Sequence, residues 1–160
     1  MLVLKFGGSS VGNPKGIEKI IGIIKENNQS PVVVVSAFSG VTNTLINLAN
    51  MAVKEELYSQ QVENLGKRHK DCVTQFLKDT DRKNAFKEID RNIEMLLQIL
   101  DGICLLGELS LRSLDLVMSF GELLSANLIS FIFRANNIKA EIFSNPKDQR
   151  TNDYISGRFG

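Results

Sequence analysis

The sequence predicts an α/β fold, in which helices flank a mostly parallel sheet that carries a large helical insertion. Two short apolar runs, residues 2–6 and 32–35, have the length of buried strands. A helical pattern lies between them, and strand, helix and strand in this order predict parallel neighbours joined by a right-handed crossover. Residues 41–120 then follow helical spacing almost throughout and form the insertion.

Short-range signals mark the first two strands and the helix between them. Residues 2–6 run into Gly7-Gly8, which indicates a strand that enters a tight turn. Pro14 suits the first turn of a helix, where its missing N–H is not needed. Isoleucines follow at helical spacing (Ile17, Ile20, Ile21 and Ile24). Four consecutive valines at 32–35 predict a central strand that is covered on both faces.

Three apolar stripes with helical spacing follow the second strand. Their members are Val41, Leu45, Leu48, Ala49 and Ala52, then Val62, Leu65, His69, Cys72, Val73, Phe76 and Leu77, then Phe86, Ile89, Ile93, Leu96, Leu97 and Leu100. Residues 122–135 are apolar nearly all round, which predicts a helix that is buried on most sides. Residues 139–143 indicate a third strand, and residues 145–153 contain a loop.

Length and composition predict one compact soluble domain. The chain has 160 residues, of which 43% are hydrophobic and 23% charged, and its formal net charge is +1. Because neither sign of charge dominates, we expect no general attraction to nucleic acid or to an anionic membrane. We find no secretory signal and no apolar stretch of the roughly 18 residues that a membrane span needs. These features predict a cytoplasmic protein.

The predicted sheet is incomplete. Three strands with this many helices leave at least one sheet edge without a neighbour. Residues 157–160, Gly-Arg-Phe-Gly, resemble neither a helix cap nor a closing strand. We therefore expect residues 1–160 to be the N-terminal portion of a single larger domain.

Three residues at the end of the first strand have the properties of a phosphate site. Ligands of open parallel sheets gather at the carboxyl ends of the strands, and Lys5 lies at that end. Gly7 and Gly8 let backbone N–H groups approach an anion closely, and the next helix points its positive N-terminal end to the same place. The same residues, taken alone, also fit a plain glycine turn beside a solvated lysine.

A second loop, rich in hydroxyl groups, follows the second strand. Residues 36–43 are Ser-Ala-Phe-Ser-Gly-Val-Thr-Asn, and parallel pairing of the strands would bring this loop beside Lys5. Ser36 and Thr42 could then bind a polar substrate or a phosphate oxygen. The alternative is an ordinary turn that caps the next helix. Two such loops at adjacent strand ends favour a ligand site.

Four segments of the sequence form an ordered set of motifs. They are Lys-Phe-Gly-Gly-Ser-Ser-Val at 5–11, Val-Val-Ser-Ala at 34–37 with Gly-Val-Thr-Asn at 40–43, Ser-Phe-Gly-Glu-Leu-Leu-Ser at 119–125, and Arg-Thr-Asn-Asp at 150–153. Together they resemble the signature of aspartate kinases, in the amino-acid kinase family. The first and third motifs are the most specific, and the long helical insertion is also similar to that of aspartate kinases.

On the phosphate side, the resemblance implies that Lys5 is catalytic. It would contact the transferred phosphoryl group and neutralise charge that grows in the transition state. Gly7 and Gly8 would supply phosphate-binding amides, with help from Ser9. The resemblance implies ATP as the phosphoryl donor. Mg²⁺ would travel with the nucleotide, so no metal site made by the protein itself is implied.

On the substrate side, the resemblance implies that Ser36 and Thr42 line the aspartate pocket and that Glu122 holds the substrate ammonium. Without the motif, Glu122 is equally well explained as a glutamate near a helix start, stabilised by the helix dipole. The substrate carboxylate has a pKa of about 3.9 in a free side chain and needs no general base. The reaction would depend on alignment and on cations around the phosphoryl oxygens.

The implied reaction is the ATP-dependent phosphorylation of L-aspartate to 4-phospho-L-aspartate, the first step of lysine, threonine and methionine biosynthesis. The full-length protein would be a homo-oligomer. The nucleotide-binding half of such a domain is not in these 160 residues, so we expect the chain to be inactive alone. Two alternatives stay open. One is another member of the family, and the other is a truncated, non-catalytic subunit that pairs with or regulates a full kinase.

The histidine and the two cysteines are predicted to have structural roles. His69 sits on an apolar helical stripe. Cys72 and Cys104 also lie in apolar surroundings and are expected in the core. Their separation and the lack of metal-type spacing favour reduced thiols over a disulfide.

Overall fold

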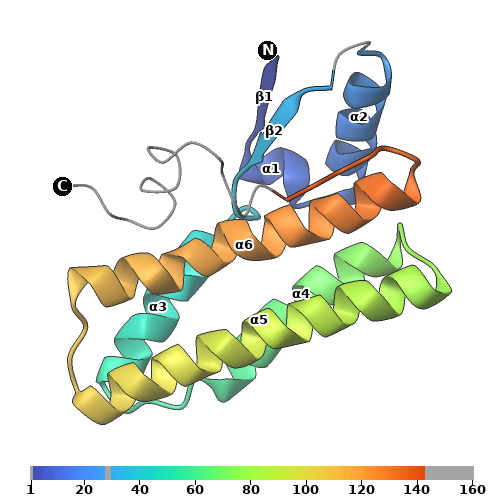
Figure 1. The fold of residues 1–160 in the computed structure, drawn as a ribbon. Coiled ribbons are helices and arrows are strands. Elements are labelled where there is room, and N and C mark those ends of the chain that lie inside the picture. Colours follow the sequence, from blue (N-terminus) through green and yellow to red (C-terminus); the bar gives the residue numbers. More distant parts are fainter. Residues whose placement is uncertain (1, 28–29, 143–160) are drawn as a thin grey trace.

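The computed structural model describes residues 2–27 and 30–142 (Figure 1). A small parallel sheet with two helices stands beside a group of four longer helices. In chain order the elements are β1 (Val3–Phe6), α1 (Gly8–Val11), α2 (Pro14–Lys25), β2 (Val32–Val35), α3 (Val41–Val53), α4 (Ser59–Thr74), α5 (Asp79–Leu106) and α6 (Leu111–Ala135). The predicted α/β fold with a large helical insertion is therefore confirmed.

Strands β1 and β2 are parallel neighbours. Lys5 lies beside Val34 in the register, and Phe6 lies beside Val35. The ladder continues past the strand ends, because the N–H of Ser36 donates to the carbonyl oxygen of Phe6 at 3.1 Å. The loops that follow the two strands thus leave the same edge of the sheet, as the sequence predicts.

The two faces of this sheet differ in exposure. Leu4, Phe6, Val33 and Val35 pack against the hydrophobic core, whereas Val3, Val32 and Val34 are 52%, 47% and 43% exposed. The prediction of a strand covered on both faces is therefore wrong for the described residues. Side chains alternate across a strand, and among residues 2–27 and 30–142 only one of the two sheet faces has helices packed on it.

The predicted third strand is not found in the described part of its segment. Residues 139–142 form no strand, while residue 143 and the loop at 145–153 lie outside the described residues. After α6 the chain turns at Asn137, which has a positive φ of 60°. A strand is defined by hydrogen bonds to a neighbour, and β1 and β2 pair only with each other in the described residues.

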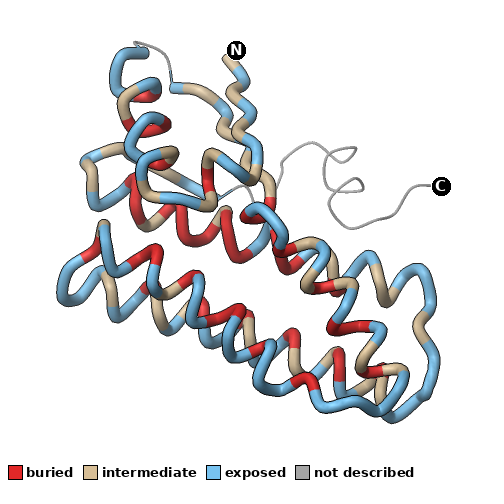
Figure 2. Tube along the Cα trace, turned by 180° about the vertical axis from the view of Figure 1, so that it is seen from behind, coloured by how far each residue is buried: buried red, intermediate tan, exposed pale blue. Residues whose placement is uncertain are grey.

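The helices match the predicted apolar stripes. Pro14 occupies the first turn of α2, and the side chain of Asn13 caps that helix by accepting a hydrogen bond from the N–H of Gly16. The stripes of α3, α4, α5 and α6 face one another and form one continuous core. Figure 2 shows buried residues on the inner sides of these helices and exposed residues on their outer sides.

Helix α6 connects the sheet to the rest of the molecule. It packs against β2 on one side and against α3 and α5 on the other. By length and composition it could cross a membrane, contrary to the expectation that no stretch is long enough, but 61% of its most apolar window is buried inside the protein. That burial, with polar residues such as Asn127 and Ser130 also enclosed, is typical of a core helix.

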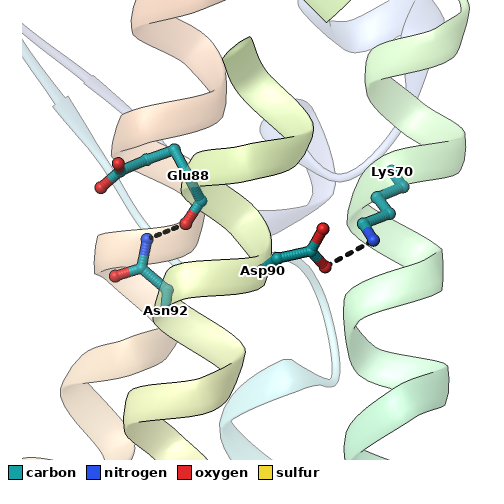
Figure 3. Close-up of polar contacts among 4 residues, drawn as sticks. All are labelled: Lys70, Glu88, Asp90 and Asn92. Atoms are coloured by element: carbon teal, nitrogen blue, oxygen red, sulfur yellow. Dashed lines mark hydrogen bonds and ion pairs between the residues drawn. The ribbon is translucent and has the colours of Figure 1, made fainter. Parts of the chain in front are cut away.

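An ion pair joins α4 to α5, and a second polar contact lies within α5 (Figure 3). The ammonium of Lys70 on α4 lies 2.5 Å from a carboxylate oxygen of Asp90 on α5. The buried Asn92 donates from its side-chain amide to the backbone carbonyl of Glu88 at 2.8 Å. Its donor is therefore satisfied within its own helix, as burial of a polar group requires.

Candidate functional site

The candidate site lies where the loops after β1 and β2 leave the sheet. The N–H of Ser39 donates to the carbonyl oxygen of Gly8 at 3.2 Å, which ties the second loop to the first. A Cβ atom on Gly8 would collide with the carbonyl oxygen of Ala37. A glycine is thus required at position 8 by the close approach of the two loops, whatever ligand the site holds.

The phosphate-side residues are accessible. Lys5, Gly7 and Ser9 are exposed, and Gly7 has nothing within 4 Å of the place where a Cβ would be. Within the described residues the ammonium of Lys5 forms no ion pair. A cation and an open stretch of backbone therefore lie at the edge of the sheet where the sequence predicts them.

Helix α6 approaches the second loop from another side. The N–H of Ala37 donates to Oε1 of Glu122 at 3.3 Å, and the Oγ of the buried Ser125 donates to the carbonyl oxygen of Ser36 at 2.8 Å. A Cβ on Gly121 would lie only 2.7 Å from the Cβ of Ala37, so this glycine permits the approach. The third sequence motif is therefore joined directly to the second.

The position of Glu122 corrects one expectation. Helix α6 begins at Leu111, where Ser110 caps it by accepting from the N–H of Ser113. Glu122 thus lies in the middle of the helix, and stabilisation by the helix dipole, which is confined to the first and last turns, does not explain it. Glu122 is exposed and forms no ion pair within the described residues, so its carboxylate can accept an external cation.

Thr42 and Ser9 have a looser connection to this arrangement. Thr42 lies in the first turn of α3 and is half-buried, and within the described residues its hydroxyl makes no hydrogen bond. The side-chain amide of Asn13 donates to the carbonyl oxygen of Ser9, which joins α1 to the start of α2. The backbones of both residues therefore lie near the site, but their hydroxyl groups have no hydrogen-bond partner among the described residues.

Sequence reasoning missed the contacts made by Ala37 and Ser125. Ala37 acts through its backbone N–H, which no side-chain pattern can indicate. Ser125 stands four residues after Gly121 on the same helix face, a spacing that could have indicated a shared contact. The motif at 119–125 contains both Gly121 and Ser125. Only the folded structure shows that Gly121 lies against Ala37 and that Ser125 bonds to Ser36.

The predicted structural roles of the histidine and of one cysteine are confirmed. His69 is fully buried, and burial lowers its pKa from the ordinary 6.5 to about 4. Cys72 is buried and its pKa is raised to about 11 by the same cause. Cys104 is only half-buried but packs against the core, and both cysteines are free thiols.

Comparison with known proteins agrees with this arrangement. Residues 1–157 match the model of the amino acid kinase family. The chain is 32% identical over 136 residues to aspartokinase 2, chloroplastic, of Arabidopsis thaliana, covering 80% of this chain and 23% of the relative. It is also 30% identical over 141 residues to the bifunctional aspartokinase/homoserine dehydrogenase 2, chloroplastic, of the same plant. This match covers 87% of this chain and 15% of the relative.

A solved structure has the same fold. The crystal structure of E. coli aspartokinase III in complex with aspartate and ADP (R-state) is similar with a TM-score of 0.74 and 25% identity, covering 88% of this chain and 30% of that chain. This chain therefore spans less than a third of the length of these relatives. Because the family model covers nearly every residue, the chain belongs to the amino acid kinase family.

Proposed function

We propose that this chain is part of an aspartate kinase and contributes the aspartate pocket and one side of the phosphate site. The observation that carries the proposal is the junction of three motifs at one sheet edge. Ala37 is bonded to Glu122, and Ser36 to Ser125, directly beside the glycines that follow β1. The relatives named aspartokinase support the choice of acceptor.

In this proposal the substrate-side residues recognise the amino acid. Glu122 accepts the ammonium of L-aspartate with the carboxylate oxygen that Ala37 leaves free. Ser36 and Thr42 line the pocket around the carboxylate that becomes phosphorylated. A charged hydrogen bond of this kind contributes about 1.5–3 kcal/mol, which is enough to select an α-amino acid over a dicarboxylate that lacks the amine.

The phosphate-side residues fit a nucleotide. Lys5 is an exposed cation at the strand end, and the open backbone at Gly7 can donate N–H groups to phosphate oxygens. ATP supplies the phosphoryl group when bound. Within the described residues no group of three or more His, Cys, Asp or Glu side chains could hold a metal ion. We assign Mg²⁺ to the phosphates of the nucleotide, with which it travels.

The remaining expectations stay predictions. They are that the protein is cytoplasmic, that the full-length enzyme is a homo-oligomer and that these 160 residues alone show no turnover. The last rests on the share of the relatives that the chain spans, and a phosphotransfer assay on the isolated chain that gave turnover would contradict it.

The role of Glu122 can be tested in the full-length protein with Glu122→Gln. This change keeps an oxygen that accepts from Ala37 and removes the charge. We expect the KM for L-aspartate to rise by about 10-fold or more, since loss of a charged hydrogen bond of about 1.5–3 kcal/mol corresponds to that factor. The KM for MgATP should stay within about twofold. Steady-state kinetics with both substrates measure these values.

Glu94→Gln is the matched control, because Glu94 is an exposed glutamate on α5 and is expected to leave both constants unchanged. Equal KM values for aspartate in Glu122→Gln and Glu94→Gln would show that Glu122 does not bind the substrate. Phosphorylation of another acceptor, with none of aspartate, would contradict the proposed function itself.

A further inference from the structure

Helix α4 contributes none of the predicted site residues, yet two of its side chains contact the loop of residues 36–40. Nη2 of Arg68 donates a hydrogen bond to the carbonyl oxygen of Ser39 at 2.9 Å. The ring of His69 stacks on Phe38, with 4.5 Å between ring centroids and 20° between planes. The Arg68 guanidinium also lies 5.9 Å from the centroid of the Phe38 ring. Helix α4 therefore contacts both the backbone and the buried side chain of this loop.

The orientation of the His69 ring is fixed by its own helix. Its Nδ1 lies 2.8 Å from the carbonyl oxygen of Leu65, and a carbonyl can only accept, so Nδ1 carries the proton. Nε2 then has a bare lone pair, and it has no hydrogen-bond partner within the described residues. An apolar residue would fill this place without leaving a polar atom unpaired. What histidine adds is a flat, uncharged ring whose rotation is locked against Phe38.

The other sides of the loop are held by different elements. The N–H of Ser39 is bonded to Gly8, and that of Ala37 to Glu122, so α1 and α6 each fix one side. Phe38 points into the core and is 1% exposed. Helix α4 holds the third side of the loop through its contacts with Phe38 and Ser39.

We propose that Arg68 and His69 are positioning residues for the loop of residues 36–40. The kinetic part of this inference rests on the proposed function, in which the loop carries the aspartate pocket. Neither side chain contacts the reacting groups; both act through Ser39 and Phe38. A misplacement of about 1 Å at an active site can lower the rate about 100-fold, so a loop released on one side should position aspartate poorly. The bond from Ser39 to Gly8, which involves neither of these side chains, should keep the phosphate side in place.

Hydrogen exchange of the loop amides in the full-length protein tests the inference without any activity measurement. Arg68→Met keeps the apolar stem of the side chain and removes the hydrogen-bond donors. We expect the amides of Ala37 and Val41 to exchange about tenfold faster, which corresponds to a loss of about 1.4 kcal/mol in the free energy of opening the loop. Arg68→Lys restores one donor and should recover part of the protection. Lys67→Met changes the exposed neighbour on α4 and should leave the exchange unchanged.

His69→Leu should act in the same direction as Arg68→Met, since it fills the position with an apolar side chain and removes the flat ring. Exchange in the core of α5 serves as the reference for global stability, so that only a selective increase in the loop counts. Equal loop exchange in Arg68→Met and Lys67→Met would overturn the positioning role of Arg68, and unchanged loop exchange in His69→Leu would overturn that of His69.

The kinetic readout separates this inference from the proposed function. In an active enzyme, Arg68→Met should raise the KM for aspartate about 5- to 10-fold, as expected for a loss near 1–1.4 kcal/mol, with the KM for MgATP within about twofold of wild type. Selective loop exchange in a protein that does not phosphorylate aspartate would support the positioning role and refute the proposed function. An unchanged aspartate KM beside altered exchange would refute the kinetic part.

Discussion

At Ala37 and Glu122 a single hydrogen bond joins residues that are 85 positions apart. Sequence motifs predict that Lys5, Ser36 and Glu122 share one site, because parallel strand ends and a shared resemblance indicate it. They do not show that Glu122 lies in the middle of a helix, or that its carboxylate accepts a hydrogen bond from the backbone N–H of Ala37. Backbone donors carry no side-chain signature, so this part of the site could be found only from the folded arrangement.

His69 gives the molecule a defined pH dependence. Its pKa is about 4 in the folded chain, against an ordinary 6.5. Between these values the unfolded state binds more protons, so the free energy of unfolding falls as the pH drops from about 6.5 toward 4. We expect His69 to account for a loss of about 2–3 kcal/mol between pH 7 and pH 4.5. Urea unfolding at these two pH values measures it.

His69→Phe is the comparison for this measurement, because phenylalanine keeps a ring at the position and does not titrate. Carboxylates titrate in both proteins over the same range, so only the difference between the two pH profiles reports on His69. Parallel profiles for the wild type and the variant would show that His69 is protonated in the folded state as easily as in the unfolded state.

Among the elements, the long helices were the most predictable. Their apolar stripes repeat over several turns, and the 3.6-residue period remains visible whatever the helices pack against. Strands were harder, because the four valines of β2 suit a covered strand and a half-open one equally well. Residues 139–142 have strand-like composition, but a strand also needs a partner, which is not encoded in the segment itself.

The contact between α4 and α5 allows a quantitative prediction. Lys70 and Asp90 form a short ion pair, but their side chains are 29% and 52% exposed, so water screens the pair. We expect a double-mutant cycle with alanine at both positions to give a coupling free energy of about 0.2–1 kcal/mol. This coupling should shrink in about 1 M salt, where the screening length is only about 3 Å.

The pair of Arg91 and Glu88, which are 3.9 Å apart within α5, is the control for this cycle and should couple more weakly than Lys70 and Asp90. Urea unfolding of the single and double variants provides all the free energies required. A coupling above about 2 kcal/mol would mean that the pair is far less accessible to water than its exposure indicates.

For the molecule as a whole, the two faces of the sheet should respond differently to the same substitution. Val33 packs on the core, and Val34 is 43% exposed on the opposite face. Val33→Thr places a hydroxyl group against apolar side chains, which costs about 1–3 kcal/mol. Val34→Thr leaves the hydroxyl in water and should change the unfolding free energy of the 160-residue chain by less than about 0.5 kcal/mol.

Chemical denaturation of the two threonine variants is a sufficient test, because they differ in position and not in chemistry. If Val34→Thr cost as much as Val33→Thr, the outer face would be covered in solution. The overall class of the molecule was predictable from the order of its patterns, whereas which sheet face stays open depends on how the helices pack around it.

The bond from Ser125 to Ser36 spans 89 residues, and it has a consequence for the timing of folding. Local helix formation takes about a microsecond or less, while contacts between distant residues must first overcome the entropy of closing a long loop. During synthesis at about 5–20 residues per second, Ser36 is made about 4 to 18 seconds before Ser125. The nascent chain therefore holds its two strand-end loops without their α6 partner throughout that interval, and α6 can bond to Ser36 and Ala37 only after most of the helical insertion has been made.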